Sequence, residues 1–397
     1  MEKRSGAEAI FGLGGGTVPE GSQKNLEKAE DLCKKRKPKK AIPYLVEAIL
    51  ESPDNLDAAI QCAYLSDQEG DRAEAIEMLE LAERTGQRTL KKTLGEDCFE
   101  AKGRHVGRFW LVMETRPYMR VLQALVRIYF EEGRYEESEK LMIEMLRLCP
   151  RDNTSQRAWL GSMLIRNGHY ANALYFIQAW IEHESPPGGG IAFKAPSRSL
   201  LSASQAREQS RFAIANMMHD AALASFRLFG DCPQSRQFLK IAAYVQPIIF
   251  TKILTRASRP EKLDMHPRPD NGPEDAHDYL WLTQDLWMEP DVWQWVNQSQ
   301  DVKNGILQFC DKCYKRETTV AEFKRCSACR VVRYCTPQCQ KKDWSTHKPD
   351  CKAFLEQKVQ HRQLYPVKSF MGKNSTFTTM LHPCKLALRQ FQRPGCP

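Results

Sequence analysis

Eight side chains that can bind a metal lie in four closely spaced pairs within residues 310–351, and this pattern constrains the fold more than any other feature of the chain. The pairs are Cys310/Cys313, Cys326/Cys329, Cys335/Cys339 and His347/Cys351. Four Cys or His ligands complete one tetrahedral zinc site, so eight ligands fill two sites. A two-residue spacer forms a knuckle whose sulfurs meet one metal, and a three-residue spacer places both ligands on one face of a helix. The sequence therefore predicts two Zn²⁺ ions per chain.

The spacing does not decide which pairs share an ion. Between Cys329 and Cys335 the residues RVVRY alternate in the manner of a short strand, which at ~3.3 Å per residue carries the chain away from one metal. These two neighbouring pairs should therefore hold different ions, and both a sequential and an interleaved pairing remain open. Pro349, between His347 and Cys351, argues against a regular helix at the last pair.

The succession C-x2-C, C-x2-C, YC-x3-C and W-x2-H-x3-C resembles the MYND zinc finger, including Tyr334, Gln338, Trp344 and Lys348. A RING finger would need two-residue spacers in its last pairs. A HIT-type finger is similar but usually more compact, and is therefore the second choice. The MYND resemblance implies an interleaved arrangement. One zinc would be held by Cys310, Cys313, Cys335 and Cys339, and the other by Cys326, Cys329, His347 and Cys351.

The MYND resemblance also implies a protein-interaction module that binds short proline-containing peptides. Sites closed by four protein ligands are structural rather than catalytic, so the contacts to a peptide should come from residues beside the ligands. Gln338 and Trp344 are the candidates, because they lie near ligands in the matching motif without coordinating metal. For Trp344, packing against the finger is the alternative role.

Before the cysteine pairs, apolar and small residues recur at helical spacing in units of about 34 residues, which resembles the tetratricopeptide repeat over about 25–183. In the first unit, Ala29, Ala41 and Ala48 would let two antiparallel helices approach closely, and Pro53 would end the second helix. An ordinary helical bundle is the alternative. Stacked helix pairs of this kind expose a groove that can bind a peptide. No lysine or asparagine that would clamp a peptide carboxylate stands out from the sequence.

The chain is thus predicted to be mainly α, with a helical-repeat solenoid followed by a small two-zinc finger. Glycine-rich composition predicts disorder at the N-terminus, and SPPGGG interrupts the helical pattern. Four tryptophans between Trp281 and Trp295 are expected to cover a core rather than form a binding surface. We expect a disordered segment (1–22), a helical-repeat domain (23–257) with an insertion (86–115) and a break (185–200), a Pro-rich linker and Trp-rich helical segment (258–300), the finger (310–351), and a C-terminal helix with an irregular tail (352–397).

Cysteine usage and hydropathy indicate an intracellular protein. Seven of the fourteen cysteines lie in the paired cluster, and the N-terminus has no apolar core of signal-peptide length. No apolar run of roughly 18 residues predicts a membrane-spanning helix, so no membrane partner is expected. The run KKRKPKK, from Lys34 to Lys40, resembles a nuclear-import signal or forms a solvated turn between helices. These features do not separate the nucleus from the cytoplasm.

The net charge of +9 raises the question of a nucleic-acid ligand. Residues 303–352 contain twelve Lys/Arg and five Asp/Glu, whereas seven thiolates with two Zn²⁺ carry a net charge of −3. Much of the local basicity therefore balances thiolate charge. The finger also lacks the ββα spacing of zinc fingers that read bases. We accordingly do not expect nucleic acid as the principal ligand.

These features predict a non-enzymatic adaptor that binds protein partners through the repeat groove and the finger, with transcriptional regulation as the process that the MYND resemblance implies. One alternative is a protein-lysine methyltransferase, since some MYND proteins combine the finger with a SET domain and tetratricopeptide-like helices. In those proteins the helices follow the finger, whereas here they precede it. The 46 residues after Cys351 are also too few for that catalytic half. A nucleic-acid-binding zinc finger protein is the other alternative.

Overall fold

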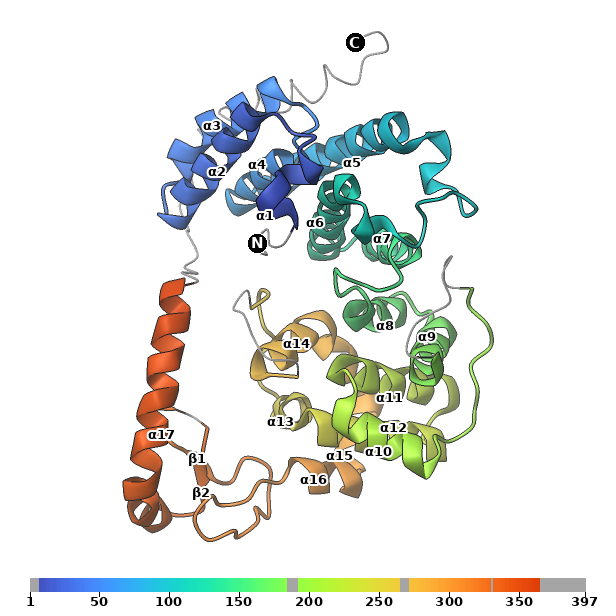
Figure 1. The fold of residues 1–397 in the computed structure, drawn as a ribbon. Helices are drawn as coiled ribbons and strands as arrows, with labels where there is room; N and C mark the ends of the chain where they lie inside the picture. Colours follow the sequence, from blue (N-terminus) through green and yellow to red (C-terminus); the bar gives the residue numbers. More distant parts are fainter. Residues whose placement is uncertain (1–6, 184–191, 265–270, 330, 365–397) are drawn as a thin grey trace. The chain divides into compact units, whose positions relative to one another are not determined.

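A computed structural model describes residues 7–183, 192–264, 271–329 and 331–364. Helices account for most of these residues, and the strands within these ranges are two short segments near the C-terminal end (Figure 1). The predicted mainly α fold is therefore confirmed. The described residues form two compact units, one of residues 7–160 and one that begins at Gly161.

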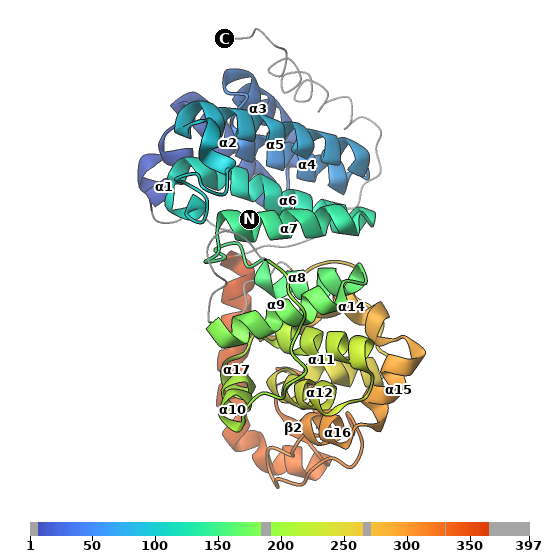
Figure 2. The ribbon, with the colours of Figure 1, turned by 90° about the vertical axis from the view of Figure 1, so that its right-hand side faces the viewer.

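The first unit is built from successive pairs of helices that stack one beside the next (Figure 2). The pairs are α2 (Glu20–Lys34) with α3 (Pro38–Glu51), α4 (Leu56–Gln68) with α5 (Arg72–Leu94), and α6 (Arg116–Glu132) with α7 (Tyr135–Leu148). Ala29, Ala41 and Ala48 are buried between α2 and α3, as expected for small residues where two helices approach closely. Neighbouring pairs also contact each other, so each buries an apolar face that it could not bury alone.

The basic run from Lys34 to Lys40 lies at the turn between α2 and α3. Lys34 ends α2, Pro38 begins α3, and Arg36 between them adopts a left-handed conformation with φ 59°. The lysines of this turn are exposed. The structure thus places this run in a solvated turn between two helices.

The insertion predicted at 86–115 begins later than expected, because α5 continues to Leu94. Gly86 allows this, since a Cβ atom there would lie 2.8 Å from Tyr118 and 2.9 Å from Leu56. The rest of the insertion contains three short 3-10 helices, η2 (Glu96–Phe99), η3 (Phe109–Leu111) and η4 (Met113–Thr115), with turns between the first two.

The expectation of disorder at 1–22 is wrong for residues 7–22, which have defined structure; residues 1–6 lie outside the described ranges. Residues Ala7–Phe11 form the short helix α1, Leu13–Gly15 form the 3-10 helix η1, and α2 begins at Glu20. The glycines from 12 to 16 all have positive φ, which only glycine adopts freely, so they build tight turns here. Leu13 is 1% exposed. Composition alone did not predict that Leu13 is buried.

The second unit contains α8 from Gly161 onward and a further group of helices. These are α9 (Tyr170–His183), α10 (Ala203–Phe212), α11 (Ala215–Phe229), α12 (Pro233–Val245), α13 (Pro247–Leu254), α14 (Pro273–Trp287), α15 (Pro290–Gln298) and α16 (Gln300–Ile306). Helix α8 itself spans Arg157–Arg166. The break predicted at 185–200 falls between α9 and α10, although residues 184–191 lie outside the described ranges, as do 265–270 of the predicted Pro-rich linker.

The Trp-rich segment forms part of this unit's core, as predicted. Trp287 is fully buried, and Trp281 and Trp295 are 5% and 7% exposed. The indole N–H of Trp287 donates a hydrogen bond of 3.0 Å to the Tyr279 hydroxyl. Trp295 stacks on Phe226 with ring centroids 4.3 Å apart. Trp287 also lies edge-on to His219, so these rings join α14 and α15 to α11.

A buried carboxyl group lies at the centre of the same core. Asp220 on α11 accepts hydrogen bonds from the Ser162 hydroxyl (2.9 and 3.0 Å) and from the Tyr279 hydroxyl (3.0 Å). Burial raises the pKa of Asp220 to about 8, although both hydrogen bonds favour the charged form. Burial also lowers the pKa of the adjacent His219 to about 4. The network therefore holds both residues uncharged near neutral pH.

The cysteine-rich region follows α16 and contains two strands and one long helix. Strands β1 (Lys324–Arg325) and β2 (Arg333–Tyr334) pair antiparallel, and α17 spans Pro337–Leu364 (Figure 1). The predicted strand between Cys329 and Cys335 is thus present as β2. The irregular tail predicted within 352–397 lies outside the described ranges from residue 365. None of the helices in the described ranges combines the length and apolar character needed to cross a bilayer.

Candidate metal centre

Two clusters of four metal-ligating side chains form within residues 310–351. The ligand atoms of each cluster all lie within 4.8 Å of one another. The first cluster comprises Cys310, Cys313, Cys335 and Cys339, and the second comprises Cys326, Cys329, His347 and Cys351. All eight ligands predicted from the sequence are therefore brought together in two groups of four.

The first cluster joins an N-terminal knuckle to the start of α17. The knuckle closes through hydrogen bonds from the Cys310 N–H to the Lys315 carbonyl (2.8 Å) and from the Tyr314 N–H to the Cys310 carbonyl (2.9 Å). Opposite it, Cys335 follows β2 and Cys339 lies in the first turn of α17. The sulfur of Cys335 lies 3.5 Å from that of Cys313 and 3.6 Å from that of Cys339.

The second cluster joins the β1–β2 knuckle to the next turns of α17. The Cys326 N–H donates to the Val332 carbonyl (2.9 Å), and the Val331 N–H donates to the Cys329 sulfur (3.4 Å). His347 and Cys351 lie four residues apart on one face of α17, and the His347 Nε2 lies 3.4 Å from the Cys329 sulfur. All four ligands of this cluster are buried.

These spacings fit tetrahedral zinc. With Zn–S bonds of ~2.3 Å, two sulfurs on one zinc lie about 3.8 Å apart, and a sulfur and a nitrogen lie slightly closer. The sulfur–sulfur distances of 3.5 and 3.6 Å in the first cluster and the sulfur–nitrogen distance of 3.4 Å in the second are close to these values. Each cluster can therefore hold one Zn²⁺ through four protein ligands.

The ionisation of the first cluster also favours a bound cation. Burial opposes ionisation of Cys310, but the backbone N–H groups of Cys335, Cys313 and Lys312 outweigh it and lower the pKa of Cys310 to about 6. Burial raises the pKa of Cys335, and the surrounding sulfurs raise it further, to about 12. One thiolate thus forms readily while Cys335 is held protonated, and a divalent cation would remove the repulsion between their charged forms.

The two clusters are interleaved along the chain, as the MYND resemblance implied. The sequential pairing that spacing alone left open does not occur. The objection raised by Pro349 was wrong, because α17 continues through it to Leu364. A proline removes one backbone hydrogen bond but its φ suits a helix, and His347 and Cys351 on either side belong to the same cluster.

The two candidate peptide contacts do not lie on one face of α17. Gln338 is exposed and Trp344 is 42% exposed, with its ring edge-on to His347 at a centroid distance of 6.1 Å. They are six residues apart, which places them about 120° apart around the helix axis. Gln340 lies one turn before Trp344, about 40° away, and is half-buried. Gln340 was not among the candidates named from the sequence.

Comparison with known proteins agrees with this geometry. Residues 310–351 match the family of the MYND finger. The chain is 43% identical over 51 residues to the SET domain-containing protein 14 of Caenorhabditis elegans, covering 13% of this chain and 11% of that protein. It is 46% identical over 43 residues to a histone-lysine N-methyltransferase of Homo sapiens, covering 11% and 9%. It is 52% identical over 54 residues to an F-box protein of Arabidopsis thaliana, covering 13% and 14%.

The similarity is thus confined to a small part of every protein compared. This chain spans at most 14% of the lengths of these three relatives, and they carry different names as whole proteins. What they have in common with this chain is a short region of the size of the finger. Two interleaved Cys/His clusters and the family match lead to one conclusion: residues 310–351 of this chain are a MYND zinc finger.

Proposed function

We propose that this protein is a non-enzymatic adaptor that binds protein partners through its MYND finger and its helical repeats. The observation that carries the proposal is that each of the two clusters supplies four protein ligands. Tetrahedral zinc then has no position left for water or substrate, so the metals stabilise the fold of the finger instead of acting on a reactant. The finger's function accordingly falls to its exposed side chains.

The exposed face of α17 suits the binding of a short peptide. Trp344 presents an aromatic surface that is 42% exposed beside the second cluster, and its indole N–H can donate a hydrogen bond to a ligand. Proline-containing peptides are extended and rigid, and they dock on exposed aromatic rings at a small entropic penalty. Gln340, one turn before Trp344, can hydrogen-bond the peptide backbone. Gln338 stays a candidate contact on the neighbouring face.

The methyltransferase alternative has support only from relatives that match this chain over the finger. A finger found in a histone-lysine N-methyltransferase and in an F-box protein is compatible with many activities. We therefore propose the activity that needs only the finger itself, which is protein binding. Transcriptional regulation is the process that we propose for it, on the basis of the MYND resemblance.

The proposal is tested with a library of proline-containing peptides and the full-length chain. Trp344→Ala and Gln340→Ala should each weaken binding about tenfold or more, because each removes a direct contact. Gln338→Ala, at the candidate contact on the neighbouring face, should also weaken binding but by a smaller factor. Zinc content and thermal stability should stay unchanged in all three variants. A library without any binder would contradict the proposal.

A random oligonucleotide distinguishes the nucleic-acid alternative. Lys341 and Lys342 are exposed on α17, and reversing both charges should leave peptide binding nearly unchanged. If nucleic acid were the ligand, the same change would weaken oligonucleotide binding, and affinity would fall steeply with salt. Salt-sensitive oligonucleotide binding without peptide binding would overturn the adaptor proposal.

A further inference from the structure

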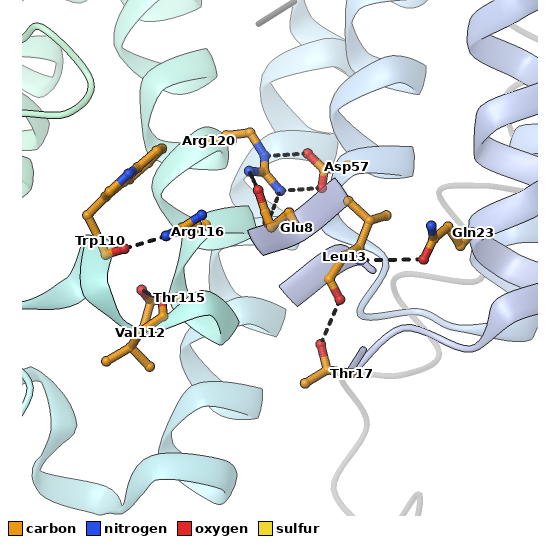
Figure 3. A network of polar contacts seen from close by, with 10 residues as sticks. All are labelled: Glu8, Leu13, Thr17, Gln23, Asp57, Trp110, Val112, Thr115, Arg116 and Arg120. Carbon is orange, nitrogen blue, oxygen red and sulfur yellow. Dashed lines mark hydrogen bonds and ion pairs between the residues drawn. The ribbon is translucent and has the colours of Figure 1, made fainter. Parts of the chain in front are cut away.

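A half-buried arginine in the first unit, Arg120, binds two carboxylates at once. Arg120 on α6 donates two hydrogen bonds of 2.7 Å to the carboxylate of Asp57 on α4. The other edge of the guanidinium donates to the Glu8 carboxylate on α1, at 3.0 and 3.2 Å (Figure 3). The Asp57 and Glu8 side chains are only 2% and 4% exposed. Arg120 therefore holds Glu8, 112 residues away in sequence, with the geometry of a carboxylate clamp.

Asp57 orients the guanidinium independently of Glu8. Since one bidentate contact of two hydrogen bonds fixes the edge that faces α4, the edge that faces Glu8 stays in position when Glu8 is absent. The three charged groups together carry a net charge of −1, and the two carboxylates repel each other. Departure of Glu8 would leave a neutral Arg120–Asp57 pair instead of an unpaired buried charge, so the contact can open without the large penalty of an isolated ion.

Five residues after Glu8, Leu13 provides a second anchor. Its side chain is 1% exposed, and its backbone N–H donates a hydrogen bond of 3.4 Å to the side-chain oxygen of Gln23 on α2 (Figure 3). The 3-10 helix η1, which contains Leu13, contacts α6 and η4. The segment is thus held by a carboxylate, a backbone amide and an apolar side chain, which is how proteins commonly bind an unstructured peptide.

The segment itself has little structure of its own to hold it there. Helix α1 has five residues, far fewer than an isolated helix needs to be stable in water. Gly12, Gly14, Gly15 and Gly16 connect it to α2, and their positive φ values show a backbone that depends on glycine freedom. The contacts to Arg120 and Gln23 therefore determine where residues 8–13 lie.

We infer that Arg120, Asp57 and Gln23 form a binding site for an acidic segment of a partner protein, and that residues 8–13 of the chain occupy this site in the absence of the partner. The partner segment would carry a carboxylate about five residues before a leucine or a similar apolar side chain. This inference deepens the proposed role of the helical repeats as a binding scaffold. The finger has no part in it.

An intramolecular ligand competes at a high effective concentration. A free partner segment therefore binds weakly until it exceeds that concentration or until the N-terminal segment is weakened. Removing the Glu8 carboxylate would take one charged hydrogen-bonded pair away from the competing N-terminal segment. The apparent affinity for a free partner segment should then rise on the order of tenfold to a hundredfold. The same loss would apply to a free peptide that lacks the carboxylate.

The test uses a fluorescent peptide with the sequence of residues 7–18 and full-length chains. Fluorescence anisotropy should show that the Glu8→Gln chain binds this peptide at least tenfold more tightly than the unmodified chain does. A peptide with Glu8→Gln should bind the Glu8→Gln chain at least tenfold more weakly than the original peptide. Glu20→Gln, at an exposed glutamate at the start of α2, is the control chain and should bind like the unmodified one.

A double variant, Glu8→Gln with Leu13→Ala, should increase peptide binding further, and circular dichroism shows whether it stays folded. If Leu13→Ala unfolds the chain, the single Glu8→Gln variant alone decides. Equal binding of both peptides, equal binding by the unmodified and Glu8→Gln chains, or no binding by a folded Glu8→Gln chain would overturn the inference. Binding of a proline-containing peptide to the finger, measured on the same chains, shows separately whether the proposed function holds.

Discussion

The hydroxyl of Tyr334 donates a hydrogen bond of 2.8 Å to the carboxylate of Asp343, and this bond connects β2 to α17. Tyr334 precedes the ligand Cys335, and Asp343 lies midway between the ligands Cys339 and His347 on α17. Asp343 also pairs with Lys312 of the first knuckle at 3.6 Å. One side-chain contact thus ties together segments that serve both clusters.

Removal of this hydroxyl should destabilise the finger without removing a ligand. We expect Tyr334→Phe to lower the free energy of unfolding of the zinc-loaded finger by about 1–2 kcal/mol, because Asp343 loses a buried donor. Zinc release under increasing chelator concentration measures the effect. Tyr314→Phe is the control, since Tyr314 is a 77% exposed tyrosine in the same finger. An equal effect of both changes on zinc release would show that the Tyr334 hydrogen bond does not stabilise the finger.

Asp220 and His219 predict an unusual dependence of stability on pH. Asp220 has a pKa of about 8 when folded and about 3.8 when unfolded, so its contribution to stability is lost as pH rises from 4 to 8. His219 has a pKa of about 4 when folded and about 6.5 when unfolded, so its contribution grows from pH 4 to 6.5. The two effects offset each other below pH 6.5. Between pH 6.5 and 8 the free energy of unfolding should then fall by about 2 kcal/mol.

The Asp220→Asn variant separates these contributions by chemical denaturation between pH 4 and 8. Asparagine keeps an oxygen for the Tyr279 and Ser162 hydroxyls but does not ionise. The decline in stability between pH 6.5 and 8 should then disappear, because residue 220 no longer ionises. Asp301→Asn, at a surface aspartate paired with Lys240, should leave the original profile in place. A decline above pH 6.5 that survives in Asp220→Asn would contradict this assignment.

Metal removal should unfold the finger and leave the helical units folded. Zinc affinity contributes directly to the folding free energy of the finger, because each metal joins ligands that lie in separate segments. The helices from α2 to α7 contain none of the eight ligands. After chelation, zinc should be released from the chain while far-ultraviolet circular dichroism keeps most of its helical signal. Loss of most of that signal would show that the helical units depend on the finger.

The sequence predicted the ligands and the helical character well, because both rest on local spacing. The four pairs from Cys310 to Cys351 have the spacings that knuckles and helix turns require, and the alanines at 29, 41 and 48 lie where helices pack. The choice between sequential and interleaved pairing depends on how β2 and α17 fold back. For that choice, resemblance to a family gave the expectation and spacing did not.

The features that sequence reasoning missed arise from long-range contacts. Residues 7–18 have a composition typical of disorder, but Leu13 is buried and Glu8 meets Arg120 112 residues away. No local sequence pattern predicts the contact between Glu8 and Arg120. The prediction that Pro349 would interrupt the helix was wrong for a related reason. The ligands on either side of it, His347 and Cys351, belong to one cluster and stabilise the helix there.

The most direct test of the account counts zinc in full-length chains with two ligands replaced. Cys310 and Cys335 share a cluster here, whereas Cys310 and Cys326 do not. Elemental analysis should find two zinc ions in the unmodified chain, one in Cys310→Ala with Cys335→Ala, and none in Cys310→Ala with Cys326→Ala. The reverse order for the two double variants would establish sequential pairing, and one zinc or fewer in the unmodified chain would contradict the two-site finger itself.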